Sequence, residues 1–287
     1  MDNNRKALIP LWFFCVLLAV ILAVFGTAGS WRQKKRAEEE VSVEQEQKMA
    51  SIESSLEAET AEKTVKLTDG QKKILNSLTE KFQEEDLESA ARIISENEPV
   101  LEELFFDSLA DKVFLYNGQT MTDQAEGEGL VFTRASTVFF GNFQDGKPEG
   151  QCTAIQVLHL EEGNRYDYSK GPWKKGKMNG QGECGYDYFD GLEGEGPETV
   201  IKQGTFSEDQ LEGEIQYVNV GADGVWITWN MTVSKGQIVL DDRWSRTEDS
   251  QGRPVYQLMD SGGAGYAYQM EETSLGQGMW RNMIEFK

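Results

Sequence analysis

One spacing pattern recurs along the middle of the chain and limits the possible folds more than any other feature. A glycine at position zero is followed by an aromatic residue at two and by glycines at five and nine, as in Phe143, Gly146 and Gly150 after Gly141. Copies with this spacing, some with substitutions, begin at Gly118, Gly141, Gly171 and Gly204, and a worn fifth copy begins at Met231. The starts are 23, 30, 33 and 27 residues apart, so a short unit recurs with insertions of varied length. Self-similarity of this kind indicates a repeat architecture.

Each unit reads as a β-hairpin. Positions four and five, Asp145-Gly146 and Lys175-Gly176 in two copies, have the chemistry of a tight turn, because glycine accepts the positive φ that such turns need. A two-residue turn there pairs position zero with nine and position minus two with eleven. The sequence therefore predicts a mainly β fold, an elongated antiparallel sheet of tandem hairpins.

Side-chain alternation gives this sheet two different faces. Positions minus two, zero, two, seven, nine, eleven and thirteen share one face, which is apolar with glycine gaps. Positions six, eight and ten share the other face and contain no apolar residue in four copies: Gln124, Glu126, Glu128, Lys147, Glu149, Gln151, Lys177, Asn179, Gln181, Gln210, Glu212 and Glu214. We expect one dry face and one wet face.

At these residues the chain resembles the MORN (membrane occupation and recognition nexus) repeat family, and the resemblance covers about Tyr116 to Gly213. Ser169 stands where the leading aromatic residue of its copy is expected, and Cys152 and Ile215 replace the last glycine of theirs. The resemblance implies a non-enzymatic scaffold, since members of that family act as scaffolds, dimerise, or have been proposed to bind phospholipid.

The amino-terminal end predicts a membrane anchor. After a tail at residues 1–6, residues 7–26 contain no charge, and about 20 such residues in a helix match the hydrocarbon core. We assign a transmembrane helix to 7–27. The alternative is a cleaved signal peptide, for which Thr27-Ala28-Gly29-Ser30 offers small residues.

Charge limits the partners of the rest of the chain. Of the formal net charge of −21, residues 1–36 carry +5, which leaves −26 on residues 37–287. Such an acidic body argues against binding nucleic acid and against binding an anionic bilayer. Anionic lipid contact is expected only from the four basic residues Arg32, Lys34, Lys35 and Arg36. These residues favour a cytosolic body, but the sequence leaves the side of the membrane open.

Two segments separate the anchor from the repeats. Residues 28–67 form a charged stalk, for which a short coiled coil is the alternative. Residues 68–110 predict three short amphipathic helices, the first with an N-cap at Thr68-Asp69. We expect this helical cap to cover the open first hairpin. Residues 111–287 are the β-repeat domain, with closing strands near Val255-Tyr256-Gln257-Leu258 and Tyr266-Ala267-Tyr268.

No motif indicates catalysis, a metal or a cofactor. His159 is the one histidine of the chain and reads as a structural strand residue. Cys152 and Cys184 fall on the apolar face of neighbouring copies, offset by two positions, and are expected to be small buried residues without a disulfide. Adjacent acids such as Asp241-Asp242 read as solvated surface.

A row of aromatic residues is the candidate binding surface: Phe139, Phe143, Tyr168, Trp173, Tyr186, Phe206, Tyr217 and Trp229. Rings over glycines also hold neighbouring hairpins together, so the row is either core or an open groove. We expect a single-pass, membrane-anchored interaction protein that binds a protein, a peptide or its own copy along this row. The alternative is an extracytoplasmic ligand or cation sensor that uses the acidic loops or the groove.

Overall fold

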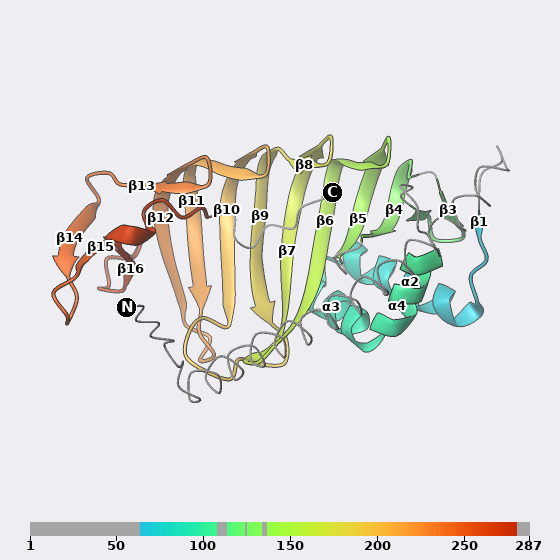
Figure 1. Cartoon of the computed structure of the whole chain (residues 1–287), viewed down its shortest axis with the longest axis horizontal. Helices are drawn as coiled ribbons and strands as arrows, with labels where there is room; N and C mark the ends of the chain where they lie inside the picture. The colour runs from blue at the N-terminus through green and yellow to red at the C-terminus, as the bar shows by residue number, and fades with distance from the viewer. Residues whose placement is uncertain (1–63, 108–113, 124, 134–136, 280–287) are drawn as a thin grey trace, which may run out of the picture. The chain divides into compact units, whose positions relative to one another are not determined.

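The fold is dominated by one long antiparallel sheet (Figure 1). A computed structural model describes residues 64–107, 114–123, 125–133 and 137–279, all within the second of the two units into which the chain divides, Ala61–Lys287. The thirteen strands of the large sheet are β1 (Thr64–Val65), β2 (Leu115–Tyr116), β3 (Met121–Thr122), β4 (Gly127–Phe132), β5 (Thr137–Gln144), β6 (Lys147–Leu160), β7 (Gly163–Lys174), β8 (Lys177–Met178), β9 (Gly180–Tyr188), β10 (Thr199–Ser207), β11 (Gln210–Val220), β12 (Trp226–Ser234) and β13 (Gln237–Val239).

From β4 onward the strands follow one another in chain order, as tandem hairpins require. The order across the sheet is β1-β3-β2-β4-β5-β6-β7-β9-β10-β11-β12-β13, and β8 pairs with β7. Three further strands, β14 (Trp244–Glu248), β15 (Pro254–Met259) and β16 (Ala267–Glu271), form a separate sheet and are followed by a short 3-10 helix, η1 (Glu272–Ser274). The predicted closing strands near 255–258 and 266–268 correspond to β15 and β16.

The turns lie where the spacing predicted them. Both turn residues have positive φ in each of the four later copies: Asp145-Gly146 (50° and 72°), Lys175-Gly176 (51° and 84°), Glu208-Asp209 (51° and 71°) and Lys235-Gly236 (50° and 71°). Turns with positive φ at both positions match the right-handed twist of the flanking strands. Next to the turn the expected register holds, for example Trp173 opposite Met178.

Farther from the turn the predicted pairing is wrong by two residues. Position zero was expected opposite position nine, but Gly141 pairs with Cys152, not with Gly150. The glycine at position nine forms a bulge with positive φ, at 76° in Gly150, 127° in Gly180 and 81° in Gly213. Because a slip of two keeps every side chain on its own face, the predicted two-faced pattern survives the error.

The first copy departs further. Tyr116 was expected opposite Gly129 but pairs with Leu130, a slip of one residue. A one-residue slip turns a side chain to the other face. Tyr116 accordingly packs among the helices, where its hydroxyl donates to Asn76 Oδ1 at 2.8 Å.

We call the face that carries Phe139, Cys184 and Phe206 face A, and the opposite face, which carries Val138, Tyr168 and Gln203, face B. Face A holds one apolar cluster that runs from Leu115 on β2 to Val233 on β12 and includes Leu258 and Met279. The hairpin tips contribute to it as well, since a Cβ placed on Gly182 would lie 2.7 Å from Met178 Cε. The glycine gaps of the repeat are therefore filled by side chains from the tips.

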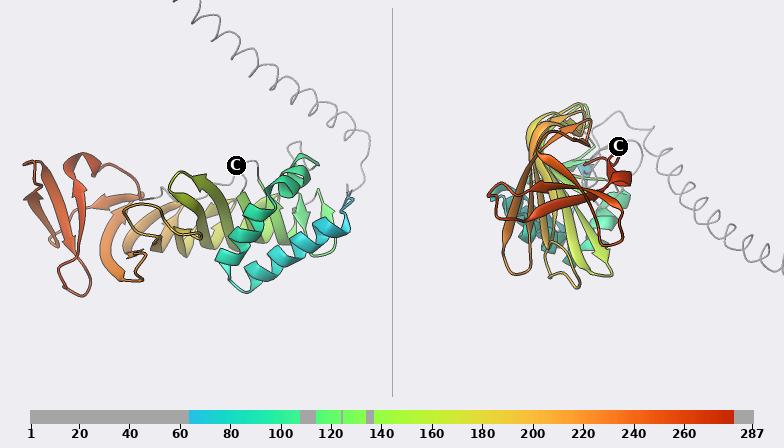
Figure 2. Two further views of the ribbon diagram at one scale, coloured as in Figure 1. Left: turned by 90° about the horizontal axis from the view of Figure 1, so that it is seen from below. Right: turned by 90° about the vertical axis from the view of Figure 1, so that its left-hand side faces the viewer.

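Three helices cover part of face B (Figures 1 and 2). They are α2 (Asp69–Gln83), α3 (Leu87–Glu96) and α4 (Glu98–Asp107). Thr68 and Gln71 form a capping box that satisfies the first amides of α2, and Leu75, Leu78 and Phe82 recur at helical spacing on its buried side. The expectation that these helices cap the open first hairpin is too narrow, because their cluster reaches Ile155, Tyr166 and other residues as far as β7.

The large sheet begins inside the segment that was predicted as a stalk. The stalk was expected to run to residue 67, but Thr64–Val65 forms the edge strand β1 beside β3. The predicted transmembrane helix at 7–27 and the basic residues Arg32 to Arg36 lie outside the described residues. Within residues 64–107, 114–123, 125–133 and 137–279, no helix is long and apolar enough to cross a membrane.

Candidate binding site

Five of the eight predicted binding residues are core residues of face A. Phe139, Phe143, Trp173, Phe206 and Trp229 are each at most 4% exposed and belong to one cluster. The ring of Phe139 lies 5.5 Å from that of Trp173 at 76°, an edge-to-face contact. The indole Nε1 of Trp173 also donates to the carbonyl of Cys152 at 3.1 Å. Because their surface is already buried against one another, these rings hold neighbouring hairpins together.

Of the other three predicted residues, Tyr217 lies on face A with the row and Tyr168 does not. Tyr168 is buried on face B under the helices, so placing it with the row was wrong. Tyr217 packs against the face A cluster, with its ring 5.3 Å from that of Tyr268 on β16. The Arg165 guanidinium lies 4.7 Å from the centre of the Tyr186 ring. Every ring that the structure describes in this set therefore has intramolecular neighbours.

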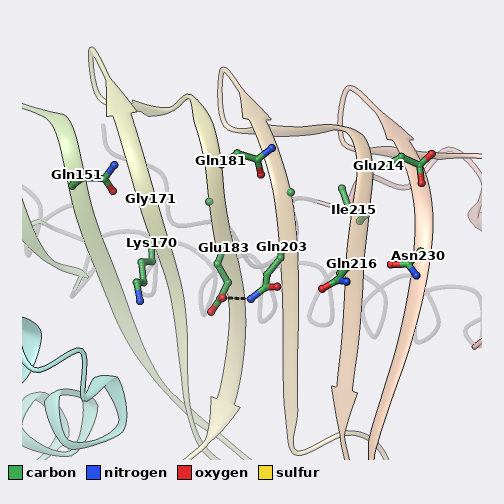
Figure 3. Close-up of a pocket in the computed structure, with 12 residues that line it drawn as sticks. Gln151, Lys170, Gly171, Gln181, Glu183, Gln203, Glu214, Ile215, Gln216 and Asn230 are labelled. Carbon is green, nitrogen blue, oxygen red and sulfur yellow. Dashed lines mark hydrogen bonds between the residues drawn. The ribbon is translucent and has the colours of Figure 1, made fainter. Parts of the chain in front are cut away.

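Face B offers an exposed alternative beyond the helices. An open groove of about 610 Å³ crosses the sheet from β6 to β12 (Figure 3). Its lining residues are Gln151, Lys170, Gly171, Gln181, Gly182, Glu183, Gln203, Gly204, Glu214, Ile215, Gln216 and Asn230. The groove is thus lined by amide side chains from five strands and by two carboxylates.

Hydrogen bonds between strands orient part of this lining. Gln203 donates its amide to Glu183 Oε2 at 2.6 Å, the dashed contact of Figure 3, and Gln181 donates to the hydroxyl of Thr205 at 2.7 Å. Each of these bonds joins β9 to β10. The amide oxygens of Gln181 and Gln203 keep their acceptor capacity while their nitrogens are held.

The carboxylates of the groove are held at its two sides. At the helical side Glu183 Oε1 accepts from the Tyr168 hydroxyl at 2.5 Å, and burial raises the pKa of that hydroxyl. At the far side Glu214 accepts from Thr232 at 2.6 Å and from Arg243 at 3.1 Å, and these bonds hold the pKa of Glu214 below its usual value. Glu214 is therefore a carboxylate at neutral pH.

The helical layer ends at one side of the groove. Lys170 contacts Glu85, which lies between α2 and α3, with Nζ at 2.5 Å from Oε2. The alternate residues on the neighbouring strands, such as Gln203, Gln216 and Asn230, are exposed. The groove is thus part of the surface of face B that lies beyond the helices.

The sequence contained part of the signal for this groove. Gln151, Gln181 and Glu214 occupy position ten, already assigned to the wet face. Lys170, Gln203 and Asn230 occupy position minus one, and Glu183 and Gln216 occupy position twelve. Both positions lie on the same face as position ten, so the hairpin pattern assigns them to the wet face as well.

The remaining predicted features have structural roles. His159 lies on β6, where its ring nitrogens lie 2.7 Å from Asn164 Oδ1 and 2.8 Å from Glu98 Oε1. Cys152 and Cys184 are buried free thiols, and burial raises their pKa to about 12 and about 11. Asp241 pairs with Arg243 at 2.5 Å, and this contact lowers the pKa of the Asp241 carboxyl to about 2.

Among the residues that the structure describes, no group of three or more His, Cys, Asp or Glu side chains could hold a metal ion. No protein-family model matches the chain, and no curated protein matches it either. What the chain does must therefore be argued from its surface.

Proposed function

We propose that this protein is a non-enzymatic binding scaffold that receives a protein partner in the groove of face B. The observation that carries the proposal is the row of exposed amide side chains across β6 to β12, on a sheet whose other face is filled by its own core. The aromatic row is replaced as the contact surface, because its best members are buried.

The lining chemistry favours an extended peptide segment of that partner. Each Gln and Asn side chain carries both a donor and an acceptor, as does each peptide unit of an extended chain. Neighbouring strands lie about 4.8 Å apart, so the lining presents hydrogen-bonding groups at regular intervals across the sheet.

The charge of the groove and of the surrounding domain further limits the class of partner. Glu183 and Glu214 contribute two carboxylates to the groove, and Lys170 is the one cation among its described lining residues. Residues 37–287 carry −26. A neutral or basic segment fits this field, while nucleic acid and anionic lipid headgroups are repelled.

The membrane part of the proposal rests on the sequence alone. The uncharged run at 7–27 would anchor the chain in a single pass, and the basic residues Arg32 to Arg36 would meet the headgroups. The hairpin spacing supports membership of the MORN repeat family, whose members act as scaffolds. The scaffold would then hold the groove near a bilayer.

Site-specific photocrosslinking in the native membrane tests this function. A photoreactive residue at Gln203 or at Asn230 should give an adduct of one defined mass, whereas the same residue at the exposed turn position Gln251 should not. An adduct of twice the chain's mass would identify a second copy as the partner. Absence of any adduct from both groove positions, or equal adducts from Gln251, would contradict the proposal.

A further inference from the structure

Four lysines gather at the tips of two neighbouring hairpins, although residues 37–287 carry a net charge of −26. Lys147 follows the turn between β5 and β6, and Lys174, Lys175 and Lys177 lie in or beside the turn between β7 and β8. The tips of these hairpins lie along the same side of the sheet (Figure 1). We call the four side chains the basic tip patch.

The two tips are held close together by contacts between the hairpins. The amide of Gly176 donates to the carbonyl of Pro148 at 3.0 Å. A Cβ placed on Gly176 would lie 3.5 Å from Cδ of Lys147, so the stem of Lys147 lies against the turn of the next hairpin. The Lys147 side chain therefore belongs to the same surface as the other three lysines.

The patch contains a pair of like charges at positions three and six of one hairpin. Lys174 and Lys177 lie directly opposite each other across the turn. Like charges in such a cross-strand pair are destabilising. In the two hairpins that follow, the same positions hold neutral residues: Ser207 with Gln210, and Ser234 with Gln237. The stability of the hairpin therefore does not account for the lysine pair.

Most of the positive charge of the patch is not neutralised within the chain. All four lysines are exposed. Lys177 Nζ contacts Glu208 Oε2 at 3.2 Å, but these side chains remain 50% and 65% exposed, and such surface pairs are weak. Among the residues that the structure describes, Lys147, Lys174 and Lys175 form no ion pair. The patch can therefore attract an external anionic group.

The acids around the patch limit the shape of that anionic group. The Glu149 carboxylate accepts from the main-chain amide of Lys175 at 2.7 Å, and the neighbouring turns contain Asp145, Glu208 and Asp209. A flat anionic bilayer would meet these acids together with the lysines and be repelled by them. An extended peptide is only about as wide as one strand spacing, about 4.8 Å, so it can contact the lysines without the neighbouring turns.

We propose that the basic tip patch is a second interaction surface, which binds an acidic peptide segment of a protein partner. The ammonium groups pair with the carboxylates of that segment and attract them through a local field opposite in sign to that of the whole domain. The groove of face B fits a neutral or basic segment, so the two surfaces select segments of opposite charge.

Fluorescence anisotropy with a labelled peptide tests the patch. The probe is a short peptide of alternating glutamate and glycine, added to the full chain in detergent at about 50 mM salt, where exposed charges are only partly screened. We expect saturable binding that weakens as the salt concentration rises. Absence of binding would overturn the proposal. The groove is not needed for this binding, so the test succeeds or fails whether or not the groove has a partner.

Charge reversal at two matched turn positions locates the binding. Lys175 and Lys235 both occupy position four, with φ of 51° and 50°, and the amide of each donates to a glutamate of the preceding hairpin. Glu208 occupies position four of another copy at φ 51°, so this turn accommodates glutamate. Lys175→Glu should weaken the affinity for the peptide on the order of tenfold, and Lys235→Glu by less than about twofold. Equal losses in the two variants would show that the patch is not the site.

A further variant and a second probe complete the test. Lys174→Glu places opposite charges at the pair with Lys177, so it should weaken peptide binding without lowering the urea midpoint. A loss of binding in this variant is then not caused by unfolding, and unchanged binding would contradict the proposal. Vesicles that contain phosphatidylserine are the second probe. If they bind and Lys175→Glu abolishes that binding, the patch recognises a lipid surface and its assignment to an acidic peptide is wrong.

Discussion

Replacing Trp173 by alanine separates the two interpretations of the aromatic row. If Trp173 were an exposed binding residue, its removal would cost little stability. The structure makes it 2% exposed, in edge-to-face contact with Phe139 and hydrogen-bonded to the carbonyl of Cys152. We therefore expect Trp173→Ala to destabilise the folded state strongly.

The size of the loss follows from the contacts. Truncation of a buried Trp to Ala typically costs about 3–5 kcal/mol, which already includes lost transfer free energy and the cavity. The substitution also removes the aromatic contact with Phe139 and leaves the carbonyl of Cys152 without its donor. We therefore expect a loss in the upper part of this range, at about 4 kcal/mol. Against a total stability of about 5–15 kcal/mol for a domain, such a loss is severe.

Urea unfolding of the full chain in detergent, followed by circular dichroism, measures this loss. The transition midpoint should fall by roughly 2 M, for an m-value of about 2 kcal/mol/M that itself stays unchanged. The matched control is Gln203→Ala on the same sheet, whose exposed side chain should cost about 0.5 kcal/mol or less. A loss below about 1 kcal/mol for Trp173→Ala would refute the core assignment.

Three further changes probe the bulges, the helical layer and the carboxy-terminal contact. Gly141→Ala would place a Cβ 2.4 Å from a carbonyl oxygen of β6 and should cost several times more in urea unfolding than Gly150→Ala, whose open site at φ 76° leaves only about 1–2 kcal/mol of strain. Since hydrogen bonds to Asn164 and to a carboxylate of α4 raise the pKa of His159 in the folded state, its contribution is fully present below about pH 6.5 and is lost as pH rises through the folded pKa. The stability deficit of His159→Gln should therefore be larger at about pH 5.5 than at about pH 8, and an equal deficit would contradict this. Lys202→Met removes the donor to the Met279 carbonyl and should speed hydrogen exchange of the Met279 amide, whereas unchanged exchange would show that the contact does not hold the segment.

The turns and the two-faced pattern were predictable because they depend on local chemistry. A turn such as Asp145-Gly146 needs positive φ at both positions, and residue type signals this directly. Once the turn is placed, side-chain alternation assigns each residue to a face. The bulge at Gly150 does not change this assignment, because a slip of two residues leaves every side chain on the same face of the sheet.

The register itself was not predictable from glycine spacing. A glycine at position nine can either pair with the glycine at position zero or form a bulge. Glycine is suited to both arrangements, so the residue type does not decide between them. The positive φ of Gly180 and Gly213 decides for the bulge, and that is a property of the paired strands.

The placement of the helices had an unused signal. Val138-Phe139-Phe140 and Ala154-Ile155 put apolar residues on both faces of β5 and β6. Strands that are buried on both sides lose their alternation, so these runs indicated a second layer over face B. Tyr168 on β7 belongs to that layer and not to the aromatic row.

The exposed site could be predicted only in part. Residues such as Gln181 were assigned to the wet face. The burial of Phe143 and Trp173, however, depends on contacts between neighbouring hairpins. Repeat spacing describes one hairpin at a time. What remains exposed is set by the packing of several hairpins together.

Cysteine scanning along β10 tests the central claim, a sheet with one dry face and one wet face, most directly. Cysteines would be placed one at a time at Ile201, Lys202, Gln203, Thr205 and Phe206 and labelled with maleimide in the folded chain. We predict fast labelling at 201, 203 and 205 and slow labelling at 202 and 206, following the burial of these residues. Uniform labelling, or fast labelling at 202 and 206, would contradict the account.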